Sequence, residues 1–344
     1  MEKKEFINFY VPLIGTEVVD DNFNCPLSSK KEENGLTKVR LQTEVVKRFY
    51  VEPFKQAVVK NDKTELLSLV NEMLNNAILF GFKIAKKWLN NDVLPYSIGN
   101  NKIGNDTLVF NCTSALLCPS SLKGYCSICK ACYAVNNEVI YGTPFVRNLL
   151  SLKRLLTVDI EVLANNTIKM ISTDSTKKDG KKAKEALFIR FNSNGDILDS
   201  KMMLDINKFA TILIKDSSNN LKVCYTYTHN KDLDVSMADS ITFNLSYKTN
   251  LKVKKTIVAF NWDKKYLDNS KYVICNGECF NCPYCKNKED KRTVVFMAHG
   301  GGFKGLDMLP NGLLDVLNAQ KALDWAKFNA KLVNPLNKQL SDFL

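Results

Sequence analysis

Apolar residues recur at helical spacing in the N-terminal part of the chain, over residues 64–88. Side chains three or four positions apart share one face of a helix, and the residues that follow this rule are Leu66, Leu67, Val70, Met73, Leu74 and Ile78. Thr64 is the predicted N-cap, and Lys86 and Lys87 lie where cations suit the helix dipole. The pattern predicts one amphipathic helix that packs its apolar face on the rest of the protein.

Beyond Leu94 the pattern changes to short apolar runs that alternate with helical periodicity. The apolar runs predict strands at residues 107–111, 186–192, 221–228, 241–247, 255–262, 272–275 and 292–299. Helical periodicity predicts helices at residues 144–171, 196–215, 232–239 and 312–332. Alternation of this kind is typical of βα units and a parallel sheet.

The expected fold class is therefore α/β, with a partial (βα) barrel-like, largely parallel sheet, a helical N-terminal extension and a helical C-terminal tail. The predicted domains are a mostly helical extension over residues 1–92, a cysteine-containing α/β domain over residues 93–305, and the tail over residues 306–344. The lysine-rich segment 176–185 is predicted to be a solvated loop.

Composition adds that the protein is of the soluble globular kind. Of its 344 residues, 45% are hydrophobic and 24% are charged, as in ordinary globular domains. No apolar run approaches the roughly 18 residues that a membrane span needs, and the start MEKKEFINFY lacks the apolar segment of a signal peptide. We expect a cytoplasmic protein without membrane contact, in a compartment where thiols stay reduced.

Eight of the eleven cysteines fall into two groups of four, which are Cys118, Cys126, Cys129 and Cys132, and Cys275, Cys279, Cys282 and Cys285. Thiolates at this density repel one another and need a bound cation. The last three cysteines of each group have the spacing C-x2-C-x2-C, as in the loop of bacterial ferredoxins around a cubane cluster. Zinc sites more often use C-x2-C pairs a dozen or more residues apart. The spacing predicts two [4Fe–4S] clusters, with two zinc ions as the alternative.

Both cysteine groups follow predicted strands, at residues 107–111 and 272–275. Ligands of parallel α/β folds gather at the carboxyl ends of the strands, so both groups are expected on the same face of one barrel-like sheet. Polar residues near the strand ends are the candidate catalytic residues: Arg190, Asn192, Asp196, Thr226, Thr228, Asn244 and Ser246.

Two of these candidates have the chemistry to bind a cofactor. Arg190 suits a carboxylate and Asp196 suits a ribose hydroxyl. The alternative is that the two residues pair with each other or cap the following helix. Tyr225 and Tyr227 share one face of a predicted strand and are assigned to the core.

The formal net charge of +12 indicates an anionic partner. Two clusters at about −2 each, thiolates included, would leave about +8, so the protein stays basic. Aromatic residues interleave with the cysteines and stand beside lysines: Tyr125, Tyr133, Phe280 and Tyr284, with Lys123, Lys130, Lys286 and Lys288. Such a set suits base stacking and phosphate contacts on nucleic acid. The alternative is that the aromatic rings shield the metal sites from water.

The segments PYSIGNNKIGNDTLVFNCTSALLCP (95–119) and CSICKACYA (126–134), followed by Arg147 and Asn148, resemble the phage gene product 88 family. RFNSNGD (190–196) matches more loosely, because Asn194 interrupts a Ser-Gly pair. The resemblance covers roughly residues 93–300. This family is encoded mostly by phages and mobile elements and has no defined activity. Its Cys-Tyr-Ala signature is similar to phage proteins related to radical S-adenosylmethionine (SAM) enzymes.

The resemblance implies a radical-SAM-like scaffold, in which three cysteines hold a cluster and one iron stays open for SAM. Cys126, Cys129 and Cys132 would be those three, with Tyr133 stacked beside the cofactor. Two departures oppose this assignment: the usual spacing is C-x3-C-x2-C, and Cys118 is available as a fourth ligand. The usual spacing occurs only at Cys275, Cys279 and Cys282, where Cys285 is again a fourth ligand.

The sequence thus leaves two functions open. One is an iron–sulfur protein of a phage or mobile element that binds or modifies nucleic acid, with the question of an enzymatic activity unsettled. The other is a non-enzymatic, zinc-stapled nucleic-acid-binding or interaction protein. The His299-Gly-Gly-Gly segment is similar to an esterase oxyanion loop, but the chain has no G-x-S-x-G nucleophile motif. Phosphate-binding and dinucleotide-binding glycine motifs are absent as well.

Overall fold

The computed structural model describes residues 42–43, 45–79, 82, 84–99, 103–126, 133–175, 177–178, 180–247, 256–259, 272–275, 279 and 282–297. Several predictions lie outside these residues: those on Cys129, Cys132, Lys130, Phe280, the side chain of Tyr133, His299 and the tail 306–344. None of the helices described is long and apolar enough to cross a membrane.

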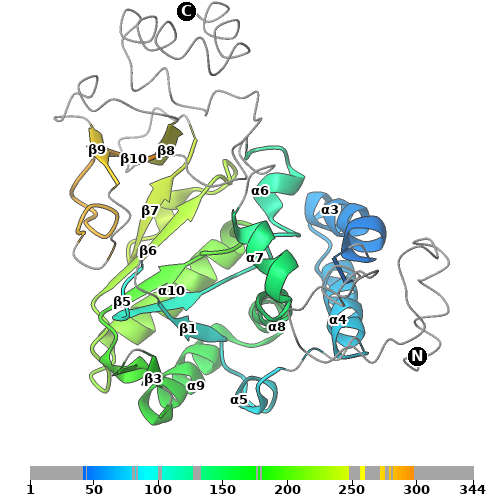
Figure 1. Ribbon diagram of the computed structural model, residues 1–344, viewed down its shortest axis with the longest axis horizontal. Coiled ribbons are helices and arrows are strands. Elements are labelled where there is room, and N and C mark those ends of the chain that lie inside the picture. The colour runs from blue at the N-terminus through cyan, green and yellow to red at the C-terminus, as the bar shows by residue number, and fades with distance from the viewer. Residues whose placement is uncertain are drawn as a thin grey trace, which may run out of the picture.

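The central element is a five-stranded sheet of β1 (Tyr96–Ile98), β2 (Thr107–Phe110), β5 (Phe188–Phe191), β6 (Val223–Thr228) and β7 (Ile241–Leu245), in the order β1-β2-β5-β6-β7 (Figure 1). β1 runs antiparallel to β2, and the other neighbours are parallel. The register places Leu108, Ile189, Cys224 and Ile241 side by side. The largely parallel sheet of an α/β fold is confirmed.

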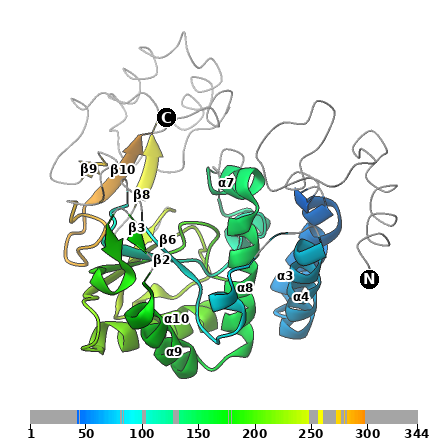
Figure 2. The same ribbon diagram turned by 60° about the horizontal axis from the view of Figure 1, so that its bottom comes forward.

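Helices α6 (Pro119–Leu122), α7 (Tyr133–Tyr141), α8 (Thr143–Thr157) and α9 (Ile160–Thr173) connect β2 to β5, and α10 (Ser200–Lys215) connects β5 to β6. Residues 144–171, predicted to form one or two helices, form two, because Asp159 accepts hydrogen bonds from the Glu161 and Val162 backbone and starts α9. α9 and α10 pack together on one side of the sheet (Figure 2).

Alternate strand residues face these helices and form the main core. Phe110 of β2 and Phe191 of β5 have ring centroids 5.6 Å apart, and Phe209 of α10 packs edge-on against both rings. Because side chains alternate along a strand, the intervening residues point to the opposite side. There Phe188, Tyr225 and Tyr227 form a second, smaller cluster with Cys285 and Val294.

A second sheet covers part of that opposite side. It has three parallel strands in the order β8-β10-β9: β8 (Thr256–Ala259), β10 (Thr293–Met297) and β9 (Tyr272–Ile274). β9 therefore does not belong to the sheet that contains β2. The expectation that both cysteine groups follow strands of one sheet is wrong, since local patterns predict strands and not their partners.

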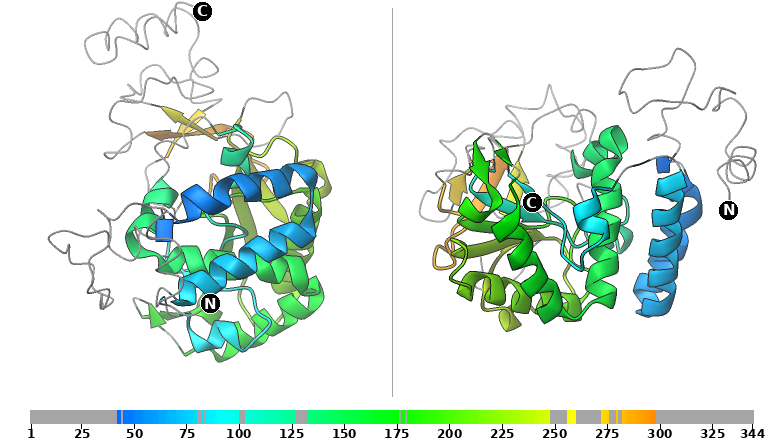
Figure 3. Two further views of the ribbon diagram at one scale, coloured as in Figure 1. Left: turned by 90° about the vertical axis from the view of Figure 1, so that its right-hand side faces the viewer. Right: turned by 90° about the horizontal axis from the view of Figure 1, so that it is seen from below.

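The N-terminal part consists of a π-helical turn (Val46–Tyr50), α3 (Val51–Lys60), α4 (Lys63–Leu79) and α5 (Lys86–Leu89). The α3–α4 pair lies outside α8 (Figure 3), and α4 packs against it. The predicted helix 64–88 is two helices, because Ala85 has an extended backbone. Asp62 accepts a hydrogen bond from the Glu65 backbone and takes the capping role expected of Thr64.

Smaller elements complete the described chain. The lysine-rich loop contains a two-stranded hairpin, β3 (Lys177–Lys178) and β4 (Lys181–Lys182), where Gly180 has a positive φ of 83°. The 3-10 turns are η4 (Ala183–Glu185) and η5 (Val235–Met237). None of them contributes to the sites described below.

Candidate metal sites

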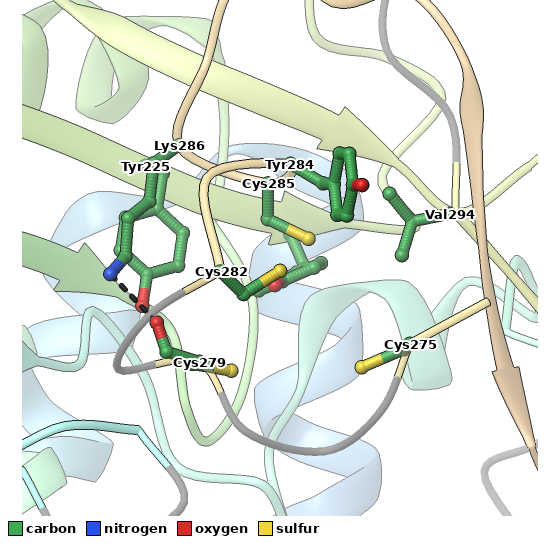
Figure 4. A pocket seen from close by; sticks show the side chains of 9 residues that line it. Tyr225, Cys275, Cys279, Cys282, Tyr284, Cys285, Lys286 and Val294 are labelled. Carbon is green, nitrogen blue, oxygen red and sulfur yellow. Dashed lines mark hydrogen bonds between the residues drawn. The ribbon is translucent and has the colours of Figure 1, made fainter. Parts of the chain in front are cut away.

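The four cysteines of the second group come together at one pocket, which we call the C-terminal cysteine pocket. It is lined by Tyr225, Tyr227, Cys275, Cys279, Cys282, Tyr284, Cys285, Lys286 and Val294. Figure 4 shows the four sulfur atoms turned toward a common space. Cys275 directly follows β9, and Cys282 and Cys285 stand on a turn that rests on β6 and β7.

Polar residues of β7 fix this turn on the sheet. The Asn244 side chain donates through Nδ2 to the Cys285 carbonyl at 3.1 Å and to the Thr226 carbonyl at 3.0 Å. Thr242 donates from Oγ1 to the Lys286 carbonyl at 3.3 Å. Asn244, one of the candidate catalytic residues, is thus an anchor of the cysteine turn.

Burial raises the pKa of two thiols of this pocket. Burial raises the pKa of Cys285 to about 12, against a hydrogen bond from the Tyr227 hydroxyl that lowers it. Burial also raises the pKa of Cys279, and the Arg190 guanidinium opposes that rise. Metal binding at such a site displaces protons from the thiols.

Cations and aromatic rings alternate around the pocket. The Arg190 guanidinium carbon lies 5.0 Å from the Tyr227 ring centroid, and that of Arg292 lies 5.0 Å from the Tyr284 ring centroid. Lys286 is only 8% exposed, so it is not placed for the surface phosphate contact that the sequence suggested. Tyr225 and Tyr227, which the sequence pattern assigned to the core, both line this pocket and are not part of the main core.

Among the described residues, no group of three His, Cys, Asp or Glu side chains is arranged to hold a metal ion. The pocket nevertheless has four cysteines in its lining. Cysteine sulfur is the ligand that structural zinc sites and iron–sulfur clusters share. The donor set therefore fits either group, and the choice between them stays a prediction.

The described members of the first cysteine group lie in the connection that follows β2. Cys118 and Cys126, its described members, stand on either side of α6 and are half-buried. The Cys126 backbone N–H donates to the Ser120 carbonyl at 3.3 Å, which holds the segment compact. Cys129 and Cys132 lie outside the described residues, so their place beside Cys118 stays a prediction.

A buried carboxylate on α7 holds the loop that leads to Cys118. Glu138 is 1% exposed, and its Oε2 accepts from the Ser114 hydroxyl at 2.6 Å and the Leu116 N–H at 3.2 Å. Its Oε1 accepts from the Ala115 N–H at 3.0 Å and from Asn148 Nδ2 at 2.7 Å. α7 begins at the residue after Cys132, and this contact ties the helix to the loop that leads to Cys118. Nothing in the sequence pattern singled out Glu138, which is one acidic residue among polar and apolar ones.

Asp196 holds the other side of the same loop. One carboxylate oxygen accepts from the Ser120 hydroxyl at 2.6 Å and the His229 N–H at 2.9 Å, and the other from the Thr228 hydroxyl at 2.7 Å and the Ile197 N–H at 2.8 Å. With both oxygens occupied and 2% exposure, this geometry favours a structural role over ribose binding.

The alternative role of Asp196 as a helix cap is taken by another residue. The Asp199 side chain caps α10 through the Met202 N–H, at 2.7 Å. Arg190 is on the opposite side of the sheet, stacked on Tyr227.

Amide side chains line the same strand ends. Asn111 Nδ2 donates to Asn148 Oδ1 at 3.0 Å, and the Asn194 N–H donates to Asn111 Oδ1 at 3.0 Å. Asn192 adopts a positive φ of 56° and accepts from the Cys112 N–H through Oδ1, at 3.1 Å. Asn192, Asp196 and Thr228 thus lie at this edge. Arg190 and Asn244 lie instead beside the C-terminal cysteine pocket.

The remaining candidates lie close to their strands. Thr226 donates to the Phe191 carbonyl at 3.2 Å, within the sheet. The Ser246 N–H donates to the Thr228 carbonyl at 2.8 Å, which continues the ladder beyond β7. Both contacts belong to the architecture of the sheet, and a catalytic role for either residue stays a prediction.

The surface next to Cys126 carries an aromatic ring with two cations near it. Lys123 Nζ lies 6.0 Å and Lys231 Nζ 5.7 Å from the Tyr125 ring centroid. Asp232 accepts from the Tyr125 hydroxyl at 2.8 Å and forms an ion pair with Lys123 at 2.7 Å. The ring is thereby held in one orientation beside the first cysteine group.

Comparison with known proteins gives one match. A family model described as Gene product 88 matches residues 84–280, which is more than half of the chain. The matched range includes the first cysteine group with Cys275 and Cys279, and it ends before Cys282. No curated protein and no solved structure matches the chain. The family resemblance seen in the sequence is confirmed.

Proposed function

We propose that this chain, which belongs to the Gene product 88 family, is an iron–sulfur protein that binds or modifies nucleic acid. The observation that carries the proposal is the convergence of Cys275, Cys279, Cys282 and Cys285 on one pocket. These cysteines lie within eleven residues of one another in the sequence, and the turn that carries Cys282 and Cys285 is docked on β7. Three of the thiols are half-buried and that of Cys285 is buried, and a bound metal group would explain why four thiols line one pocket.

Each cysteine group would hold one [4Fe–4S] cluster, and such a cluster, when bound, supplies one-electron transfer or a site for a cofactor on an open iron. Cys118 and Cys126 of the first group lie in the connection after β2, and ligands of parallel α/β folds gather on the loops at the carboxyl ends of the strands. Glu138 and Asp196 fix the Cys118 loop from both sides before any metal binds. The first group is therefore our candidate for a SAM-binding centre.

SAM could bind to a cluster of the first group only if Cys118 is not the ligand of its fourth iron. Cys118→Ser and Cys126→Ser are to be compared in anaerobically reconstituted protein. An open-iron cluster predicts that Cys126→Ser loses the cluster while Cys118→Ser keeps it. Equal loss in both variants would contradict a SAM-binding centre.

The metal proposal itself is tested one group at a time by iron analysis. Cys282→Ser should remove the cluster of the C-terminal cysteine pocket and lower the iron content from about eight to about four per chain. Cys224→Ser is the matched control, because Cys224 is a fully buried thiol that faces the main core. Iron content that is the same in both variants would contradict the assignment of the pocket.

The nucleic-acid part of the proposal is supported by the surface around Tyr125. Lys123 and Lys231 lie near its ring, which is next to Cys126. An aromatic ring with cations near it suits a stacked base and its neighbouring phosphates. The formal net charge of +12 points the same way.

The second candidate function is a zinc-stapled nucleic-acid-binding or interaction protein without catalysis. The turn Cys282-Pro-Tyr-Cys285 supports it, because a C-x2-C turn docked on a sheet is a common half-site for zinc. Metal analysis distinguishes the two, since this function predicts about two zinc ions per chain and no iron.

A further inference from the structure

One hydroxyl in the C-terminal cysteine pocket lacks a partner. Tyr225 is 1% exposed and lines the pocket, and its hydroxyl has no hydrogen-bond partner among the described residues. Buried hydroxyl groups are nearly always hydrogen-bonded. The Tyr225 hydroxyl therefore indicates that the group bound in the pocket supplies an acceptor.

A buried cation stands in the same pocket. Lys286 Nζ donates to the Cys279 carbonyl at 2.8 Å and lies 3.7 Å from the Phe188 ring centroid (Figure 4). Asp106 attracts the ammonium group electrostatically. Within the described part of the chain, however, no carboxylate forms an ion pair with Lys286. A buried charge without an ion-pair partner is costly, so the pocket calls for a negatively charged occupant.

A third donor faces a cysteine directly. The Tyr227 hydroxyl forms a hydrogen bond with the Cys285 thiol. The pocket thus offers hydroxyl and ammonium donors around four sulfur atoms, and the residues that line it include no carboxylate. A cubane cluster with four thiolates meets both requirements, because its sulfides accept hydrogen bonds and its total charge is about −2. A zinc ion with four thiolates carries the same total charge of about −2, but it lacks the sulfide acceptors of the cluster.

We propose that Tyr225 and Lys286 are the donor and the counter-ion of a cluster in the C-terminal cysteine pocket, and that they set its reduction potential. The inference rests on the proposed iron–sulfur function. Reduction adds one electron from an external donor such as dithionite, and the charge of the cluster with its thiolates changes from about −2 to about −3. Hydrogen bonds and a nearby cation stabilise the more negative state, so they raise the potential.

The test measures the midpoint potential by anaerobic titration with dithionite, followed by visible absorption. The full-length chain carries serine at Cys118, Cys126, Cys129 and Cys132, so that only the C-terminal cluster contributes. Tyr225→Phe removes one oxygen atom, and Lys286→Met removes the charge while keeping the length of the side chain. Both variants should have a more negative midpoint than the parent. A tenfold loss in the equilibrium constant for reduction corresponds to about 59 mV for one electron.

Two matched variants control for general effects. Tyr141→Phe changes a phenol that is 62% exposed, and Lys288→Met changes an exposed lysine two residues beyond Lys286. Neither should shift the midpoint. A cluster that loads normally, with the same midpoint in all five proteins, would overturn this inference and leave the iron–sulfur function intact. Colourless wild-type protein with zinc in place of iron would overturn both.

Discussion

Replacing Asp196 with asparagine should destabilise the protein even when no cofactor is present. In Asp196→Asn an NH2 group replaces one of the two carboxylate oxygens. Whichever oxygen it replaces, it then faces a backbone N–H, that of Ile197 or that of His229. The hydroxyls of Ser120 and Thr228 are able to rotate and accept from the amide, but a backbone N–H is not. One buried donor is therefore left without an acceptor, which costs about 1–3 kcal/mol.

The assay is urea unfolding of the full chain, followed by circular dichroism under anaerobic conditions. The free energy of unfolding of Asp196→Asn should fall by about 1–3 kcal/mol relative to wild type. The matched control is Asp205→Asn, which removes a partly exposed ion pair with Lys201 and should cost less than about 1 kcal/mol. Equal stability of wild type and Asp196→Asn, combined with a loss of cofactor binding, would refute the reasoning and favour ribose binding by Asp196.

Three further predictions concern the other sites. Burial raises the pKa of Glu138 in the folded state, so its contribution to the free energy of unfolding is fully present below the ordinary glutamate pKa and is lost as the pH rises through the folded-state pKa. In urea titrations at a series of pH values, Glu138→Gln should therefore lose less stability with rising pH than wild type. The same dependence of stability on pH in both proteins would contradict this prediction. Asn244→Ala removes the hydrogen bond to the Cys285 carbonyl and should speed metal loss to a chelator, whereas an unchanged rate would show that the turn is fixed by other contacts. Tyr125→Ala should weaken binding of a fluorescent single-stranded oligonucleotide by about 1–3 kcal/mol, while the exposed Tyr141→Ala should not; equal affinities would rule out stacking at Tyr125.

Four of the five strands of the main sheet could be predicted because each is a short apolar run bounded by polar residues, whereas the three-residue strand β1 was not predicted. The sequence also identified the cysteines that meet in the pocket, since their spacing is local. What it could not show is which strands pair. β8, β9 and β10 have the same local pattern as the main strands, yet they form a separate sheet. Pairing depends on packing between distant segments, which short-range periodicity does not record.

The residues that surround the C-terminal cysteine pocket and the Cys118 loop could not be predicted from the sequence either. Tyr225 and Tyr227 alternate along a strand as core residues do. In the structure α10 covers the other side of β6, and the side that carries the two tyrosines faces the cysteines. Glu138 has the sequence context of a solvated helix residue, although four donors converge on it in the structure. Arg190 and Asp196 are close in sequence, but they belong to different sides of the sheet.

The central claim is that the cysteine groups bind iron–sulfur clusters, and metal analysis with a visible spectrum on one anaerobically purified sample tests it most directly. The account predicts brown protein with broad visible absorption and about eight irons per chain. Colourless protein with about two zinc ions per chain would contradict it.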